Sequence, residues 1–281
     1  MKLLQKTALA LIRIKLRLLA IVSPSIAARS AFRLFCTPQQ RNLAAPGPVF
    51  ANAEIIETNF EEYKITGYRW NKGRRPQAMV LHGFESSVVN FDFYIDALVK
   101  KGYEVIAFDA PAHGKSSGKR TNALVYRNFI RHIQNEFGPS TRFVAHSFGG
   151  LALALAVAEL PVNDELRLVL IAPATETRTV VNEFMRIVQL RDPRVIKAFD
   201  EIIFNLGGHD LQWFSVTRAM QQIRSKVLWV HDRHDTVTPF RDLAEVRAQN
   251  YPNVEFVITE GLGHRRIYKD PEVGRTIVNF L

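Results

Sequence analysis

The sequence predicts an α/β protein with a mainly parallel, twisted sheet that carries helices on both faces. From about residue 77 onward, strand patterns alternate with helix patterns, which is typical of a parallel sheet. The strand patterns are near-continuous apolar runs, as expected for strands that are buried on both faces. With 281 residues, the chain is long enough for one large domain with a well-buried core.

Residues 1–45 are predicted to form a separate basic, amphipathic helical segment ahead of a domain over residues 46–281. At the 100° per residue of an α-helix, the first helical stretch has one basic side and one apolar side. Its basic side carries Lys2, Lys6, Arg13 and Arg17, and its apolar side carries Leu4, Leu11, Ile14 and Leu18, together with Lys15. Such a helix can lie in an anionic membrane interface, so we expect peripheral membrane contact through residues 1–35. The alternatives are packing on the main domain, a dimer contact, a cover over an entrance, or a mitochondrial address.

The next elements lead from one sheet edge toward its centre. Residues 53–70 alternate polar and apolar side chains and predict an antiparallel hairpin at the edge. Residues 78–81 predict a buried strand that ends at His82-Gly83-Phe84. Residues 104–108 predict a further strand, followed by a loop rich in small residues.

A serine lies between small residues where a strand pattern meets a helix pattern. Residues 143–150 pass from an apolar strand through Ser147 into an Ala/Leu-rich helix, with Ala145 and Gly149 two residues to either side. This layout suits a nucleophile elbow, in which a sharp strand-to-helix turn leaves no room for larger neighbours. The alternative is an ordinary helix N-cap.

An acid and a histidine follow downstream, each just past a predicted strand. Residues 226–230 lead into a loop that contains Asp235, and residues 254–259 lead into a loop that contains His264. A serine hydroxyl becomes a nucleophile when a histidine accepts its proton and a carboxylate orients that histidine. Open α/β sheets place their chemistry at these strand ends.

These motifs resemble the α/β-hydrolase family, specifically its esterase and monoacylglycerol-lipase-like serine hydrolases, over residues 50–281. The resemblance implies that Ser147, Asp235 and His264 are the catalytic triad. It also implies that the N–H groups of Phe84 and Phe148 form the oxyanion hole. The elbow departs from the family's G-x-S-x-G pattern at its first glycine, where Ala145 stands.

The acid motif also departs from the family pattern. Asp232 stands where the family usually has glycine, which makes it a second candidate for the acid, although the spacing to Pro239 favours Asp235. Family members usually carry an insertion between the sixth and seventh strands. Residues of about 174–222 fit such an insertion, and their apolar spacing predicts two or three amphipathic helices. With Phe84, Phe148, Trp213 and Phe214, its apolar side chains predict an apolar acyl or alcohol pocket.

The resulting expectation is a serine hydrolase that cleaves carboxylic esters, with an apolar acyl chain, through an acyl-enzyme. An amidase or peptidase, an acyltransferase and a C–C bond hydrolase share the same triad and stay open as alternatives. So does a non-catalytic, membrane-associated protein with this fold. The serine argues against branches of the fold that use an aspartate nucleophile.

Charge and composition limit the partners. The net charge is +10, but residues 1–53 contain eight basic residues and no acidic one, so the remainder is nearly balanced and we expect no nucleic acid partner. The lone Cys36 excludes an intramolecular disulfide and favours a reducing, cytoplasmic location. We expect no cofactor and no metal. His231 and His234 are the one histidine pair at possible ligand spacing, and buried or loop histidines are the commoner reading.

Overall fold

The computed structural model describes residues 3–281, with side chains from residue 6. Lys2 and the side chain of Leu4 therefore lie outside the described part. The chain divides into two compact units. The helical unit comprises the residues through Thr37 together with Glu176–Phe214, and the sheet unit comprises Pro38–Thr175 and Ser215–Leu281. The N-terminal segment and most of the insertion thus fall in the same unit.

The sheet unit contains one sheet in the order β1-β2-β4-β3-β5-β6-β7-β8. The hairpin of β1 and β2 is antiparallel and β2 pairs antiparallel with β4, whereas the pairs from β4 through β8 are parallel. The strands are β1 Glu54–Phe60, β2 Tyr63–Trp70, β3 Gln77–Leu81, β4 Glu104–Phe108, β5 Arg142–His146, β6 Arg167–Ile171, β7 Lys226–Asp232 and β8 Val254–Thr259. The predicted edge hairpin and the mainly parallel sheet are confirmed.

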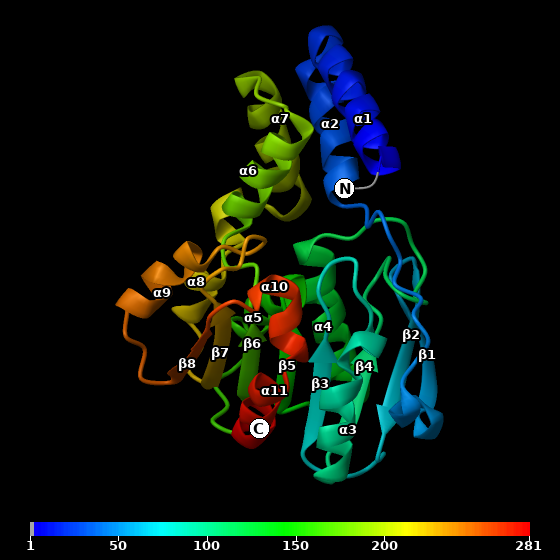
Figure 1. Ribbon diagram of the computed structural model, residues 1–281, viewed down its shortest axis with the longest axis vertical. Helices are drawn as coiled ribbons and strands as arrows, with labels where there is room; N and C mark the ends of the chain where they lie inside the picture. Colours follow the sequence, from blue (N-terminus) through cyan, green and yellow to red (C-terminus); the bar gives the residue numbers. More distant parts are fainter. Residues whose placement is uncertain (1–2) are drawn as a thin grey trace. The chain divides into compact units, whose positions relative to one another are not determined.

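Helices cover both faces of this sheet (Figure 1). The helices of this unit are α3 Asp92–Lys100, α4 Ala123–Phe137, α5 Phe148–Val157, α8 Val216–Met220, α9 Ala244–Ala248, α10 Gly263–Arg266 and α11 Pro271–Phe280. Successive strand residues point to opposite faces. Val80, Val144 and Val169 share a buried core with Ile95 of α3 and Ile277 of α11. On the other face, the Phe108 ring packs on α4, edge-on to the ring of Phe129 at 6.1 Å.

The helical unit is built from two helix pairs that are distant in the sequence (Figure 1). They are α1 Leu3–Val22, α2 Pro24–Phe35, α6 Thr177–Val188 and α7 Pro193–Gly207. α1 ends where Ser23 caps α2, accepting a hydrogen bond from the Ile26 N–H, with Pro24 in the first turn. α7 begins the same way at Asp192 and Pro193. Among the described residues, no helix is both long and apolar enough to cross a membrane.

Aromatic side chains link the two pairs, and Phe199 lies at their centre. Phe199 of α7 is fully buried, and its ring lies 5.5 Å from Phe32, 5.9 Å from Phe35 and 6.4 Å from Phe184, measured between centroids. Its contacts therefore come from α2 on one side and α6 on the other. The N-terminal helices and the insertion share one hydrophobic core.

The Phe199→Ala substitution is expected to lower the free energy of unfolding by about 3–5 kcal/mol, because it leaves a cavity where three other rings meet. Denaturant unfolding followed by circular dichroism measures this change. Phe204→Ala on the same helix is the matched control, since Phe204 is 53% exposed, and its effect should stay within about 0.5 kcal/mol. Equal effects of the two substitutions would contradict the shared core.

Candidate active site

Ser147 lies on a tight turn between β5 and α5. Its backbone has φ 55° and ψ −118°, a conformation that costs free energy in a residue with a side chain. The surrounding backbone holds it there, since its N–H donates to the Ile171 carbonyl at 3.0 Å and its carbonyl accepts from the N–H groups of Gly150 and Ala174. Position 149 has to be glycine, because a Cβ there would lie 2.6 Å from the His82 carbonyl oxygen. Ala145, which stands where the family has its first glycine, is fully buried.

Ser147, Asp235 and His264 lie in one hydrogen-bonded chain. The Nε2 atom of His264 is 3.0 Å from Ser147 Oγ, and its Nδ1 atom is 2.8 Å from Asp235 Oδ2. With Nδ1–H donating to the carboxylate, Nε2 is left to accept the serine proton. The structure therefore brings together the three residues for which the sequence predicts catalysis.

Asp235 is buried and its own loop satisfies it. Oδ1 accepts hydrogen bonds from the N–H groups of Val237 at 2.8 Å and Thr238 at 2.9 Å. Burial alone raises the pKa of Asp235, but the hydrogen bond and charge of His264 and these two N–H groups outweigh it, so the pKa is lower than usual. Asp235 is accordingly a carboxylate at neutral pH.

Thr238 is a residue of this site that the sequence analysis missed. Its hydroxyl donates to Asp235 Oδ2 at 2.9 Å. The hydroxyl oxygen itself, Thr238 Oγ1, lies 3.1 Å from His264 Nδ1. Thr238 is buried, and its hydroxyl bonds to the same carboxylate oxygen that accepts from His264. The available signal was local, because an Asp followed three residues later by Thr is a common hydrogen-bonded loop motif.

His146 contacts His264 and holds its backbone in place. Its Nε2–H donates to the His264 carbonyl at 3.1 Å, and the two rings lie 4.8 Å apart. Burial, reinforced by the charge of His264, lowers the pKa of His146 to about 3, so this ring is neutral at physiological pH. It can hold the loop of His264 without adding a charge beside it.

Phe84 and Phe148 lie beside one another, with ring centroids 5.6 Å apart at 82°. Phe148 begins α5, so its N–H is one of the first-turn donors that no carbonyl of the same helix can reach. Phe84 follows Gly83, where a Cβ would lie only 3.0 Å from that of Ser147. His82 holds this loop through a 2.8 Å hydrogen bond to the Gly83 carbonyl.

Asp232, the second candidate for the acid, does not contact His264. It is fully buried and joins two loops. Its Oδ1 accepts from the His234 N–H at 2.9 Å, in the loop of Asp235. Its Oδ2 accepts from the Thr259 hydroxyl at 2.7 Å, at the end of β8, and from the Leu262 N–H at 2.9 Å, in the loop of His264. This carboxylate therefore ties the loop of the acid to the loop of the histidine.

The two histidines of the possible metal pair point to different surroundings. His231 is buried and its Nε2–H donates to the Thr238 carbonyl at 2.8 Å, whereas the His234 side chain is 63% exposed. In the described part of the chain, no group of three or more His, Cys, Asp or Glu residues could hold a metal ion.

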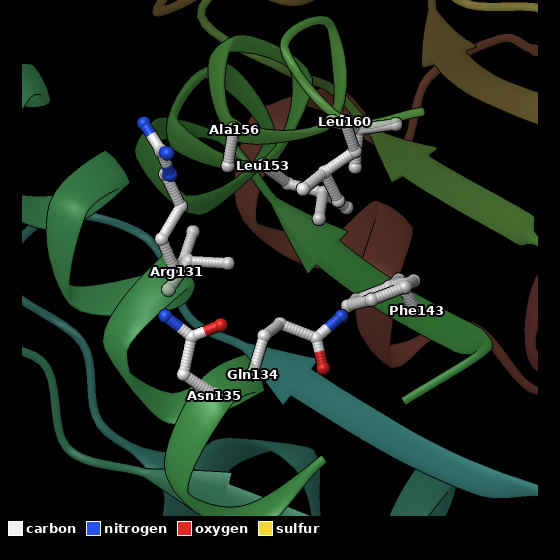
Figure 2. A pocket seen from close by; sticks show the side chains of 9 residues that line it. Arg131, Gln134, Asn135, Phe143, Leu153, Ala156 and Leu160 are labelled. Atoms are coloured by element: carbon white, nitrogen blue, oxygen red, sulfur yellow. The ribbon is translucent and has the colours of Figure 1, made fainter. Parts of the chain in front are cut away.

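A small pocket lies elsewhere in the sheet unit (Figure 2). It is lined by side chains of α4 and α5, by Phe143 of β5 and by Leu160, which follows α5. Ser147, Asp235 and His264 are not among its lining residues. It is separate from the candidate active site.

Asp232→Asn is expected to lower the free energy of unfolding by about 2 kcal/mol at pH 7, because an amide NH₂ replaces an acceptor that faces the Leu262 N–H. Burial acts to raise the pKa of Asp232, but its hydrogen bonds bring the pKa from 3.8 to about 2. A carboxyl with a lowered pKa stabilises the folded state above its unfolded-state pKa, and this contribution is lost as the pH falls toward 2. The difference in the free energy of unfolding between wild type and Asp232→Asn should therefore become smaller from pH 5 to pH 3. Urea unfolding curves measure it. Exposed Asp164→Asn is the control, and a pH-independent difference would contradict this account.

Comparisons with known proteins give the family. The sequence profile of the Hydrolase_4 family, described as serine aminopeptidase, S33, matches residues 74–215, half of the chain. A Mycoplasma pneumoniae protein named "Putative esterase/lipase 2" is 25% identical over 232 residues, which is 71% of this chain and 86% of that protein.

Solved structures share the fold. The Pyrococcus furiosus esterase Pf2001 matches with a TM-score of 0.63 and 22% identity, over 87% of this chain and 95% of its own. A membrane phospholipase A, described as a bacterial virulence factor, matches with a TM-score of 0.62 and 16% identity, over 100% of this chain and 98% of its own. Taken with the sheet topology, the profile match shows that the chain belongs to the serine aminopeptidase S33 family of α/β-hydrolase enzymes.

Proposed function

We propose that the protein hydrolyses carboxylic esters through an acyl-enzyme on Ser147. The observation that carries this proposal is the hydrogen-bonded chain from Asp235 through His264 to Ser147 Oγ, at 2.8 and 3.0 Å. In this mechanism His264 accepts the serine proton as Oγ attacks the ester carbonyl, and then protonates the leaving alcohol. Water, activated by His264, releases the acid in a second cycle.

The negative oxygen of the tetrahedral intermediate is proposed to bind the N–H groups of Phe84 and Phe148. Two fixed donors of this kind stabilise the developing charge. Supporting this, Phe148 N–H stands at the first turn of α5 and Phe84 follows a glycine pressed against Ser147. The half-buried rings of the same two residues present apolar surface beside the nucleophile, which favours an apolar acyl chain over a charged one.

Ester hydrolysis is preferred over aminopeptidase activity, although the family description names the latter. An aminopeptidase binds the ammonium group of its substrate, and a carboxylate is the usual partner for that charge. The two buried carboxylates at this site, Asp232 and Asp235, already accept hydrogen bonds on both oxygens. The relative from Mycoplasma pneumoniae carries an esterase/lipase name.

We also propose that residues 1–35 make peripheral contact with a membrane. The support is their charge, since they contain seven basic residues and no acidic one, and such segments are attracted to anionic lipid. Co-flotation of the full-length protein with anionic vesicles tests the contact. A cytoplasmic location stays a prediction from the single cysteine.

Ser147→Ala is expected to abolish ester hydrolysis, with kcat lower by roughly 10⁶-fold, because Ser147 Oγ is the nucleophile that the described residues place at His264 Nε2. The measurement is hydrolysis of p-nitrophenyl esters from acetate to palmitate by the full-length protein. Wild-type activity should peak at one chain length and exceed that on amino-acid p-nitroanilides. Activity retained by Ser147→Ala, or a preference for the anilides, would contradict the proposal.

Asp235→Asn and Asp232→Asn together identify the acid. Asp235→Asn should lower kcat by about 10³- to 10⁴-fold while the protein stays folded, because His264 loses the partner that sets its tautomer. Asp232→Asn should act mainly on stability and lower kcat far less, since its carboxylate binds the loops and not the ring. The reverse order of kcat values would make Asp232 the acid.

A further inference from the structure

Helix α1 carries two apolar faces. On one face Leu9, Ile12, Leu16 and Leu19 are buried or half-buried. On the opposite face lies a second series, spaced at i, i+3, i+7, i+10 and i+11, whose members are between 54 and 82% exposed: Leu11, Ile14, Leu18, Ile21 and Val22. These spacings place the five side chains in one stripe along the helix, which we call the outer stripe.

Exposed apolar residues are concentrated in the helical unit. Fifteen large hydrophobic side chains of the described residues are exposed, and nine of them belong to this unit, although it contains about a quarter of the chain. Scattered exposed hydrophobic residues are ordinary on protein surfaces, whereas a continuous apolar stripe usually marks an interaction surface. The outer stripe contributes five of the nine.

The charges around the outer stripe have one sign. Residues 3–37 contain six basic side chains and no acidic one. Two of them, Arg13 and Arg17, are held by the end of α6, where they donate to the Ile187 carbonyl at 2.9 Å and to Gln189 Oε1 at 2.6 Å. Lys15 is exposed and borders the stripe, one turn from both Leu11 and Leu18.

This charge pattern favours one occupant. A second copy of the chain that docked stripe to stripe would bring two all-basic segments and two Lys15 ammonium groups together, which is repulsive. An anionic lipid surface matches both the positive charge and the apolar stripe. Its phosphates attract the lysines, and its acyl boundary accepts the leucines and isoleucines. The arginines fixed to α6 keep the helix oriented so that the stripe faces outward.

We propose that α1 lies along the surface of an anionic membrane with its outer stripe inserted among the acyl chains, while its inner face stays in the core of the helical unit. This inference deepens the membrane contact proposed above by naming the side chains that enter the lipid. In this proposal α1 is a packed helix before it meets the membrane, and it does not fold on binding.

The test uses the full-length protein and vesicles of phosphatidylcholine, alone or mixed equally with phosphatidylglycerol. Wild type should co-float with the mixed vesicles and much less with phosphatidylcholine alone. Ile21→Glu, and independently Leu18→Glu, should weaken partitioning at least about tenfold, because each adds a charge where an apolar side chain enters the bilayer. Val162→Glu is the matched control, since Val162 is 67% exposed but belongs to the sheet unit.

Three results would overturn the inference. The first is that the wild type does not float with the mixed vesicles. The second is that Val162→Glu loses as much vesicle binding as the stripe variants. The third is that flotation requires anionic lipid but is unchanged in both stripe variants. Sedimentation showing a dimer that Ile21→Glu dissociates, without vesicle binding, would assign the stripe to a second copy instead. Hydrolysis of soluble p-nitrophenyl esters by the same variants should equal that of wild type, so a failed lipid inference is distinguishable from a failed esterase proposal.

Discussion

The strained backbone at Ser147 is the constraint around which the sheet unit is arranged. A positive φ in a residue with a side chain persists only where neighbouring groups hold it. Here they do so from two sides, because the Ser147 N–H bonds to the end of β6 and its carbonyl receives N–H groups from the start of α5 and from the loop after β6. The turn lifts Oγ to the carboxyl edge of the sheet, where the loops after β7 and β8 bring Asp235 and His264.

The positions of those two loops depend on a buried carboxylate that takes no part in the hydrogen-bonded chain. Asp232 spans the gap between them, and Thr238 then aligns the carboxylate of Asp235. Both oxygens of each of these two carboxylates accept hydrogen bonds from fixed groups of the loops and strand ends, so their positions depend little on solvent. Preorganisation of this kind is what acyl-transfer chemistry requires, since donors that have to move at the moment of reaction lose much of their effect.

The sequence was sufficient for the local parts of the structure and insufficient for the long-range ones. The sheet, the edge hairpin and the three residues of the hydrogen-bonded chain follow from short motifs, because each motif contains its own strand, turn and functional side chain. The bridging role of Asp232 depends on contacts with Thr259 and Leu262, almost 30 residues away, and no local pattern reports them. Helical spacing grouped Leu11, Ile14 and Leu18 on one side of a helix. It did not reveal that a second row, through Leu16, is the one that packs.

The shared core of the helical unit has a consequence for how the chain is made. Phe32 and Phe35 precede every strand of the sheet in the sequence, whereas their partner Phe199 comes after β6, more than 160 residues later. At the ordinary pace of translation, the first helix pair leaves the ribosome roughly 8 to 30 s before its partner exists. During that interval the outer stripe of α1 is uncovered, and so is the side of the helix pair that later packs on α6 and α7. The nascent helix pair therefore exposes apolar surface for several seconds before it becomes part of a folded enzyme.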